Sequence, residues 1–344
     1  MGQIFVKAIL ITLALLAFAI PGFILKKLNL SGDSAKTTLS NLLLFVCQPA
    51  LMINSFAVFT QNDYATLNAV GRARIAANFG ITATIATVAM LVIFGVCKLI
   101  FVRYKDRQSA DIYTFIAMFS NCGFLGIPFV KIFTDNDVLA VMYVAVFNIV
   151  FIFLIWTLGV FLLTHDRKNI SFKKIVLNPS IIASAVGLLL FFVPQINFFM
   201  ADACKELQTV PQSLAAMVAP VSMILVGIGL AELPLKTLFC TRGVYGAGAL
   251  RLILSPILAF AIALAFRAMC SGFVGSSPVA TDYIFLAPVI ALAMSPASTV
   301  VAMSEHYGLK NDFATAAVIT DTLLSVITVP LVMIAMLELW AVIF

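Results

Sequence analysis

The chain has 344 residues, of which 62% are hydrophobic and 10% are charged, and its mean hydropathy is +1.11. A soluble domain of this length cannot bury so much apolar surface, so the composition excludes a soluble globular protein and indicates an all-α polytopic membrane protein. The net charge of +6 comes from basic residues in short connections between apolar segments, which argues against a nucleic-acid partner. The six cysteines show no C-x-x-C spacing, so we expect no disulfide framework, metal site or cofactor.

We interpret ten apolar segments as membrane spans, and no polar stretch between them exceeds about fifteen residues, so we expect no separate soluble domain. The first segment lacks a small-residue cleavage site and is too long for a signal peptide, so we interpret it as a span. The predicted spans cover about residues 4–25, 37–59, 75–101, 111–131, 138–163, 179–192, 212–231, 244–266, 283–303 and 313–339.

The fourth predicted span is interrupted at its middle. Proline lacks a backbone donor and clashes with the carbonyl four residues back, and glycine makes it easier to leave the helical conformation. At about 1.5 Å per residue, the interruption lies about 14 Å into a hydrocarbon core about 30 Å thick, where unwound backbone needs polar partners. The residues that predict it are Ser120, Asn121, Cys122, Gly123, Gly126 and Pro128.

A second interruption is predicted in the ninth span, at Ser295, Pro296 and Ser298. Paired broken spans in the two halves of a chain indicate the binding site of a transporter. Half-helix N-termini offer unpaired N–H groups that favour an anion such as a carboxylate. We expect Asn121, Ser295 and Ser298 to bind it, and the alternative is that these side chains only cap the broken backbone.

The two sets of five spans share their landmarks: a proline inside the second span (Pro49 and Pro220) and a break in the fourth. Because five is odd, the second set enters the membrane from the opposite side, which predicts an inverted repeat. We therefore divide the chain into a first repeat at 1–164, a cytoplasmic connection at 165–177 and a second repeat at 178–344, where Asn178 and Pro179 indicate a helix start.

Arg251 lies about 13 Å inside the eighth span, where an unpaired cation costs several kcal/mol. The functional interpretation is a counter-charge for an anionic substrate, or for a carboxylate that changes protonation during transport. The structural interpretation is a permanent ion pair or a side chain that extends to the membrane surface. Asp321 is the only acid well inside the second half and is the candidate partner.

Several segments together resemble the auxin efflux carrier family, which includes plant PIN-type carriers and bacterial malate-permease-like members. The segments are SNCGFLGIP (120–128), NPSII (178–182), SMILVGIGLAE (222–232), RLILSP (251–256) and LAMSPASTVVAMSEHYG (292–308). The resemblance implies two broken helices crossing at the centre of the molecule, with the substrate site at the residues named above. It implies a scaffold of spans 1, 2, 6 and 7, a moving transport domain of spans 3–5 and 8–10, elevator-like transport of a small organic anion, and a homodimer. The long central loop of many plant members is absent, which leaves the substrate open.

The sequence bears on four alternatives to an anion carrier. A cation/proton antiporter is disfavoured because the two interruptions contain no carboxylate. A sodium- or proton-coupled symporter of the bile-acid type is compatible with the architecture, and so is a membrane sensor that transports nothing. An enzyme is not expected, because His165 and His306 lie at span ends without a nucleophile or metal-ligand spacing.

The basic residues predict that both termini face outward across a plasma membrane, the inner membrane in a bacterium. Fourteen lie near the connections between spans 1–2, 3–4, 5–6, 7–8 and 9–10, and six lie on the other side.

In a background with the native cysteines replaced by serine, Phe344→Cys should react with an impermeant maleimide in intact cells. Lys168→Cys should react only in opened membranes, and the reverse pattern would rule out the ten-span topology.

Overall fold

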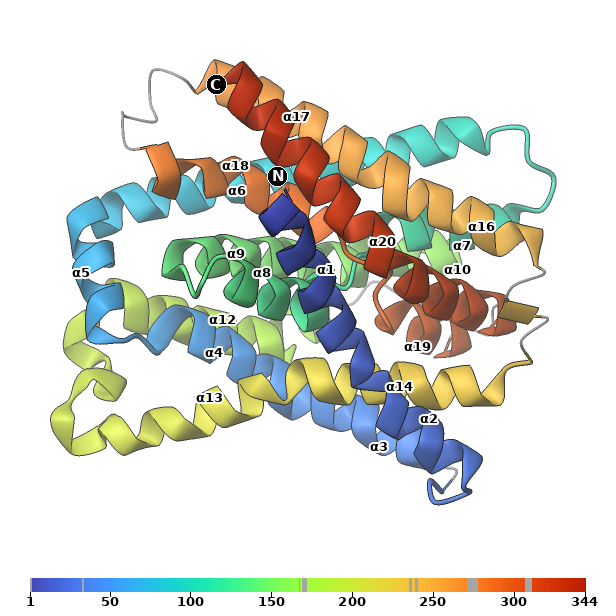
Figure 1. Ribbon diagram of the computed structural model, residues 1–344, viewed down its shortest axis with the longest axis horizontal. Helices are drawn as coiled ribbons and strands as arrows, with labels where there is room; N and C mark the ends of the chain where they lie inside the picture. The colour runs from blue at the N-terminus through green and yellow to red at the C-terminus, as the bar shows by residue number, and fades with distance from the viewer. Residues whose placement is uncertain are drawn as a thin grey trace.

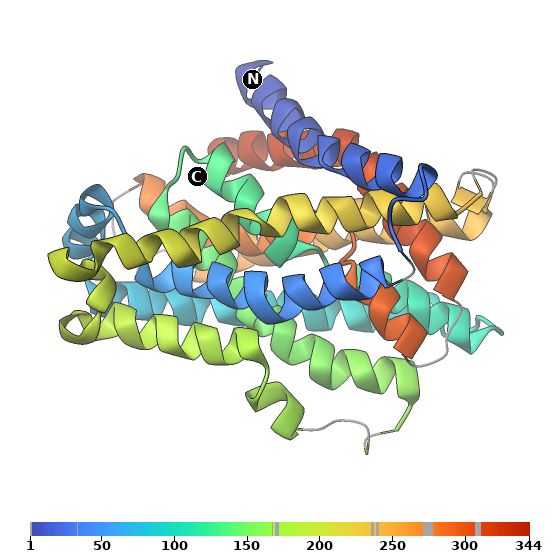
Figure 2. The same ribbon diagram turned by 90° about the horizontal axis from the view of Figure 1, so that it is seen from below.

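A computed structural model describes residues 2–32, 34–166, 168, 172–234, 237–238, 241–270, 278–306 and 311–344. Its regular elements are helices, as the composition predicts, and the described residues contain one isolated β-bridge and no named strand. Most of the longer helices follow the long axis of the molecule, whereas α1 crosses them obliquely (Figure 1). Figure 2 shows α1 and α2 at one edge of the molecule, beside α14 and α20.

The bounds of the helices are as follows. The first half contains α1 (Gly2–Ala17), α2 (Ala19–Lys27), α3 (Ala35–Leu42), η1 (Leu43–Cys47), α4 (Gln48–Ala57), α5 (Gln61–Val70), α6 (Arg72–Ile100), α7 (Arg107–Met118), η2 (Cys122–Gly126), α8 (Ile127–Phe133), α9 (Val138–Leu154), η3 (Ile155–Gly159), α10 (Val160–Thr164) and α11 (Phe172–Val176). The second half contains α12 (Pro179–Phe192), η5 (Pro194–Ile196), η6 (Phe198–Met200), η7 (Asp202–Gln208), α13 (Thr209–Ala216), α14 (Val218–Glu232), α16 (Arg242–Gly248), η8 (Ala249–Leu254), α17 (Ser255–Met269), α18 (Pro278–Ala293), α19 (Thr299–His306) and α20 (Asn311–Ile343).

Seven helical runs in the described residues are long and apolar enough to cross a membrane. They are Gln3–Lys27, Ala35–Ala57, Arg72–Ile100, Val138–Thr164, Glu206–Glu232, Gly243–Met269 and Phe313–Ile343. The predicted spans four, six and nine correspond to the shorter apolar helices Cys122–Phe133, Pro179–Phe192 and Asp282–Ala293. The structure therefore supports a multi-pass helical membrane protein, and the ten-span inverted repeat stays a prediction.

The expected helix start at Asn178 is confirmed, because the Asn178 side chain accepts a hydrogen bond from the Ser180 N–H at 2.9 Å and Pro179 opens α12. The expected effect of Pro128 is wrong in detail. The helix that begins at Cys122 continues through Gly126 and Pro128, and the interruption of span four lies at residues 119–121. The turn before Pro128 widens into the π-type helix η2, which accommodates the missing N–H and the proline ring.

The first and seventh predicted spans pack backbone to backbone. A Cβ atom on Gly22 of α2 would lie 2.1 Å from the carbonyl oxygen of Ile224 in α14. A Cβ atom on Gly227 of α14 would lie 2.0 Å from the carbonyl oxygen of Ala19, so both positions require glycine. At the end of this pair, Glu232 forms ion pairs with Lys26, at 2.9 Å, and with Lys36 at the start of α3.

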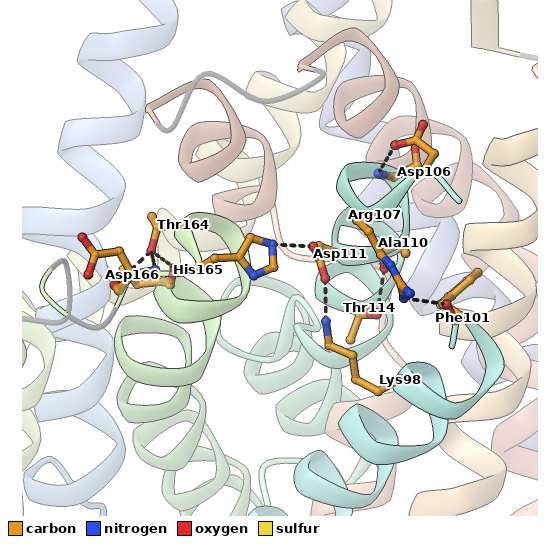
Figure 3. A network of polar contacts seen from close by, with 12 residues as sticks. Lys98, Phe101, Asp106, Arg107, Ala110, Asp111, Thr114, Thr164, His165 and Asp166 are labelled. Carbon is orange, nitrogen blue, oxygen red and sulfur yellow. Dashed lines mark hydrogen bonds and ion pairs between the residues drawn. The ribbon is translucent and has the colours of Figure 1, made fainter. Parts of the chain in front are cut away.

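The third, fourth and fifth predicted spans are joined through Asp111, whose side chain lies between Lys98 and His165 (Figure 3). Asp111 is buried at the start of α7. Its two oxygens lie 2.5 Å from Lys98 Nζ and 2.9 Å from His165 Nε2. One buried carboxylate therefore ties together the ends of α6, α7 and α10.

We expect Asp111→Ala to lower the free energy of unfolding by about 2 kcal/mol, because a buried carboxylate that accepts charged hydrogen bonds is lost. The exposed Asp166, in the same region, is the control, and Asp166→Ala should change stability by less than about 0.5 kcal/mol. Denaturant unfolding of both variants in detergent measures the difference. Equal stability of the two variants would show that the Asp111 contacts do not hold the helices together.

Candidate functional site

The two predicted interruptions lie side by side. The backbone N–H of Asn121 donates to the carbonyl oxygen of Ser295 at 2.7 Å, and the N–H of Ala297 donates to the carbonyl oxygen of Phe119 at 2.9 Å. These bonds form an antiparallel bridge between Ser120 and Pro296. The structure thus brings together the two groups of residues that the sequence predicts at the substrate site, and we refer to residues 119–121 and 294–298 as the junction.

Two helices end at the junction, α7 at Met118 and α18 at Ala293, and the last carbonyl groups of a helix have no partner inside it. The fully buried Arg251 of η8 supplies these partners. Its Nη1 and Nη2 donate to the carbonyl oxygens of Ala117 and Leu292, each at 2.6 Å, and its Nε donates to that of Met294 at 3.0 Å. A single guanidinium therefore caps both helix ends.

These contacts decide among the structural interpretations of Arg251. Its partners are backbone carbonyls at helix ends, not a carboxylate or the membrane surface. The candidate partner Asp321 forms no ion pair with Arg251 among the described contacts, although the charge of Arg251 acts on it. Each helix C-terminus carries about half a negative charge, so the two ends together offset the charge of the guanidinium.

Two new helices begin at the junction, and their first N–H groups point away from any intrahelical partner. In the described part of the chain, the N–H groups of Cys122, Gly123 and Phe124 donate to no backbone carbonyl, and the Asn121 carboxamide makes no hydrogen bond. The buried hydroxyl groups of Ser295 and Thr299 also have no partner in the described structure. The junction therefore offers hydrogen-bond donors that the protein itself does not use.

Two amide side chains that the sequence analysis missed approach the start of η2. Asn148 of α9 is fully buried, and its Oδ1 lies 3.4 Å from Cys122 Sγ. A Cβ atom on Gly123 would lie 2.8 Å from Asn148 Oδ1 and 3.4 Å from Nε2 of Gln48 in α4. Polar residues deep inside apolar spans were the signal that could have identified both, since they are rare in membrane helices.

A small, partly open cavity lies beside the junction. Its walls come from α1 and α14 on one side and from η2, α8, the junction and α20 on the other. It is mostly apolar, and four of its lining residues carry hydroxyl groups. The lining residues are Thr12, Leu15, Leu16, Leu125, Phe129, Met223, Met294, Ser295, Thr322, Ser325 and Val329.

The predicted site residues occupy different positions around this cavity. Ser295 lines it directly. Four others lie at or next to the junction: Asn121, Cys122, Gly123 and Pro296. Ser298 also belongs to the junction and is half-buried. The remaining four do not line the cavity. Gly126 and Pro128 lie in the helix that follows the interruption, and Arg251 and Asp321 lie in η8 and α20.

A multi-span helical protein with two interrupted helices joined inside it, unused donors at the junction and a cavity beside it has the features of a membrane transporter. The comparison with known families agrees. The family described as "Membrane transport protein" matches residues 5–173 and 168–333. Because the matches cover nearly the whole chain, the protein belongs to this family, the auxin efflux carrier family that its motifs resemble. No curated protein matches the chain.

We expect Arg251→Lys to destabilise the protein by about 3 kcal/mol, because an ammonium cannot reach three carbonyl groups on two helices as the planar guanidinium does. Arg267→Lys is the matched control. Its only described ion pair, with Asp282, is 3.9 Å long, so we expect a loss below about 1 kcal/mol. Thermal unfolding in detergent compares the stability of the two variants with that of the wild type. An Arg251→Lys variant as stable as the wild type would contradict the capping role.

Proposed function

We propose that the protein is a secondary transporter that moves a small organic anion, a carboxylate of the auxin-like or dicarboxylate type, across the membrane. The observation that carries this proposal is the set of unused donors at the junction: the N–H groups of Cys122, Gly123 and Phe124 and the buried hydroxyl of Ser295. Such donors at the start of a helix stabilise negative charge.

The electrostatics of the junction favour an anion over a cation. The helix C-termini, which attract cations, are already capped by Arg251. No acidic residue lines the cavity in the described part of the chain. A carboxylate bound in the cavity would meet the free hydroxyl of Ser295, with the N–H groups at the start of η2 next to the junction, whereas a bound cation would find no compensating charge.

An elevator-like movement is part of the same proposal. We assign spans 1, 2, 6 and 7 to a scaffold and spans 3–5 and 8–10 to a transport domain, within a ten-span inverted repeat with repeats at 1–164 and 178–344. The ion pairs of Glu232 support the scaffold group, and the contacts of Asp111 support the grouping of spans 3–5. The cavity supports a substrate path between the groups, because α1 and α14 face the junction and α20 across it.

We also propose that the protein is a homodimer in a plasma membrane, or in a bacterial inner membrane, with both termini outside. The family resemblance supports this assembly. Mass measurement of the purified protein in detergent tests it.

Uptake of labelled carboxylates into proteoliposomes tests the proposed function. We expect saturable uptake of at least one of succinate, malate and indole-3-acetate, absent from liposomes without protein. Protein that takes up none of them, or that takes up an organic amine instead, would contradict an anion carrier. Binding without any uptake would favour a membrane sensor.

We expect Gly123→Ala to weaken carboxylate binding about tenfold, because the added methyl group would displace the Asn148 carboxamide beside the open N–H groups. Gly126→Ala is the matched control on the same helix. Its Cβ atom would make only ordinary contact, at 3.5 Å from Met294, so binding should be unchanged. Calorimetry measures the carboxylate affinity of both purified variants. Equal affinities would show that the start of η2 is not part of the binding site.

A further inference from the structure

Asp321 is a fully buried acid in the middle of α20, and neither of its carboxylate oxygens has a hydrogen-bond donor in the described structure. The backbone of α16 closes one side of it. A Cβ atom on Gly248 would lie 2.6 Å from Asp321 Oδ1. The carboxyl group is therefore enclosed and unpartnered, although the same helix supplies Thr322 and Ser325 to the cavity.

The charged groups on the neighbouring helices do not neutralise Asp321. Among the described side chains, the elements packed against α20 carry the following charged residues: Lys7 on α1, Arg107 and Asp111 on α7, Glu232 on α14, Arg251 on η8 and Asp282 on α18. Of these, only the charge of Arg251 acts on Asp321. The N–H groups of Arg251 donate to helix-end carbonyls, whose dipoles already offset its charge.

An ionised Asp321 would thus be an uncompensated charge inside a membrane protein, which costs several kcal/mol. A metal cation could remove this cost only with several oxygen ligands. The neighbouring hydroxyls are already used: Thr320 donates to the Leu238 carbonyl at 3.0 Å and Thr322 to the Val318 carbonyl at 2.6 Å. The described residues contain no cluster of His, Cys, Asp or Glu that could hold a metal ion. A proton needs no such set of ligands.

We propose that Asp321 binds a proton and that this proton travels with the substrate, so that the protein is a proton–anion symporter. This inference rests on the proposed anion transport and adds the coupling ion. The proton adds to a carboxylate oxygen of Asp321 to give the neutral acid, and it leaves as the same proton when the carboxylate re-forms on the other side of the membrane.

The placement of the cavity explains the coupling. Thr322, the residue after Asp321, lines the cavity, and so does Met294, whose carbonyl accepts a hydrogen bond from Arg251. An anion in the cavity adds negative charge close to Asp321 and so strengthens proton binding. By linkage, the proton strengthens anion binding by the same factor.

A first measurement needs no substrate. Infrared difference spectroscopy of wild type against Asp321→Asn should show the carbonyl stretch of a protonated, buried carboxyl group at neutral pH, and the band should disappear at a definite higher pH. The control Glu338→Gln changes another acid of α20 and should keep the band. Absence of the Asp321-dependent band would overturn the proton site, whether or not an anion binds.

The second measurement is calorimetric binding of succinate and indole-3-acetate as a function of pH. Both probes are ionised throughout the range above pH about 6, so the pH dependence belongs to the protein. Wild-type affinity should fall about tenfold per pH unit above the pH at which the band disappears, and Asp321→Asn should bind with a pH-independent affinity. Asp321→Ser repeats the test if the asparagine variant does not fold.

The outcomes separate the two proposals. A pH-dependent affinity that persists in the Asp321 variants, or a wild-type affinity that does not change with pH, would overturn the coupling while leaving the anion site in place. Folded wild-type protein that binds neither probe would overturn the proposed function, and the infrared result would still decide whether Asp321 holds a proton.

Discussion

The contact between the Arg251 guanidinium and the ends of two helices solves the main problem of interrupted membrane helices. Interrupted helices inside a membrane leave carbonyl groups without partners, and hydrocarbon offers none. Arg251 binds carbonyls at the ends of both α7 and α18 with one side chain. Because its planar group reaches both helices at once, the capping contact also holds the two interruptions together. The backbone bonds of Asn121 and Ala297 complete the junction.

This arrangement divides the junction into two parts with different properties. The carbonyl groups at the helix ends are bound by Arg251, whose charge their dipoles offset, whereas the N–H groups at the start of η2 have no carbonyl acceptor. Gly123 and the amide side chains of Asn148 and Gln48 keep that side polar without adding charge. The cavity beside Ser295 is mostly apolar. An organic anion fits both properties, since its carboxylate needs donors and its hydrocarbon part needs an apolar wall.

Much of the fold could be predicted from the sequence because membrane spans and their interruptions depend on local patterns. The positions of Asn121 and Pro296 are visible as polar and helix-breaking residues inside apolar runs. The behaviour of Pro128 was not predictable, since a helix can widen before a proline instead of ending. The partners of Arg251 and the approach of Asn148 to the junction depend on packing between distant helices, which no local pattern encodes.

Recognition of negative charge at the junction underlies both proposals. Calorimetric titration of the purified protein with indole-3-acetate and with its uncharged amide is the sharpest test, because the two ligands share their apolar part and differ in the carboxylate. We expect the carboxylate to bind and the amide to bind at least tenfold more weakly. Equal binding of the two ligands, or stronger binding of the amide, would contradict it.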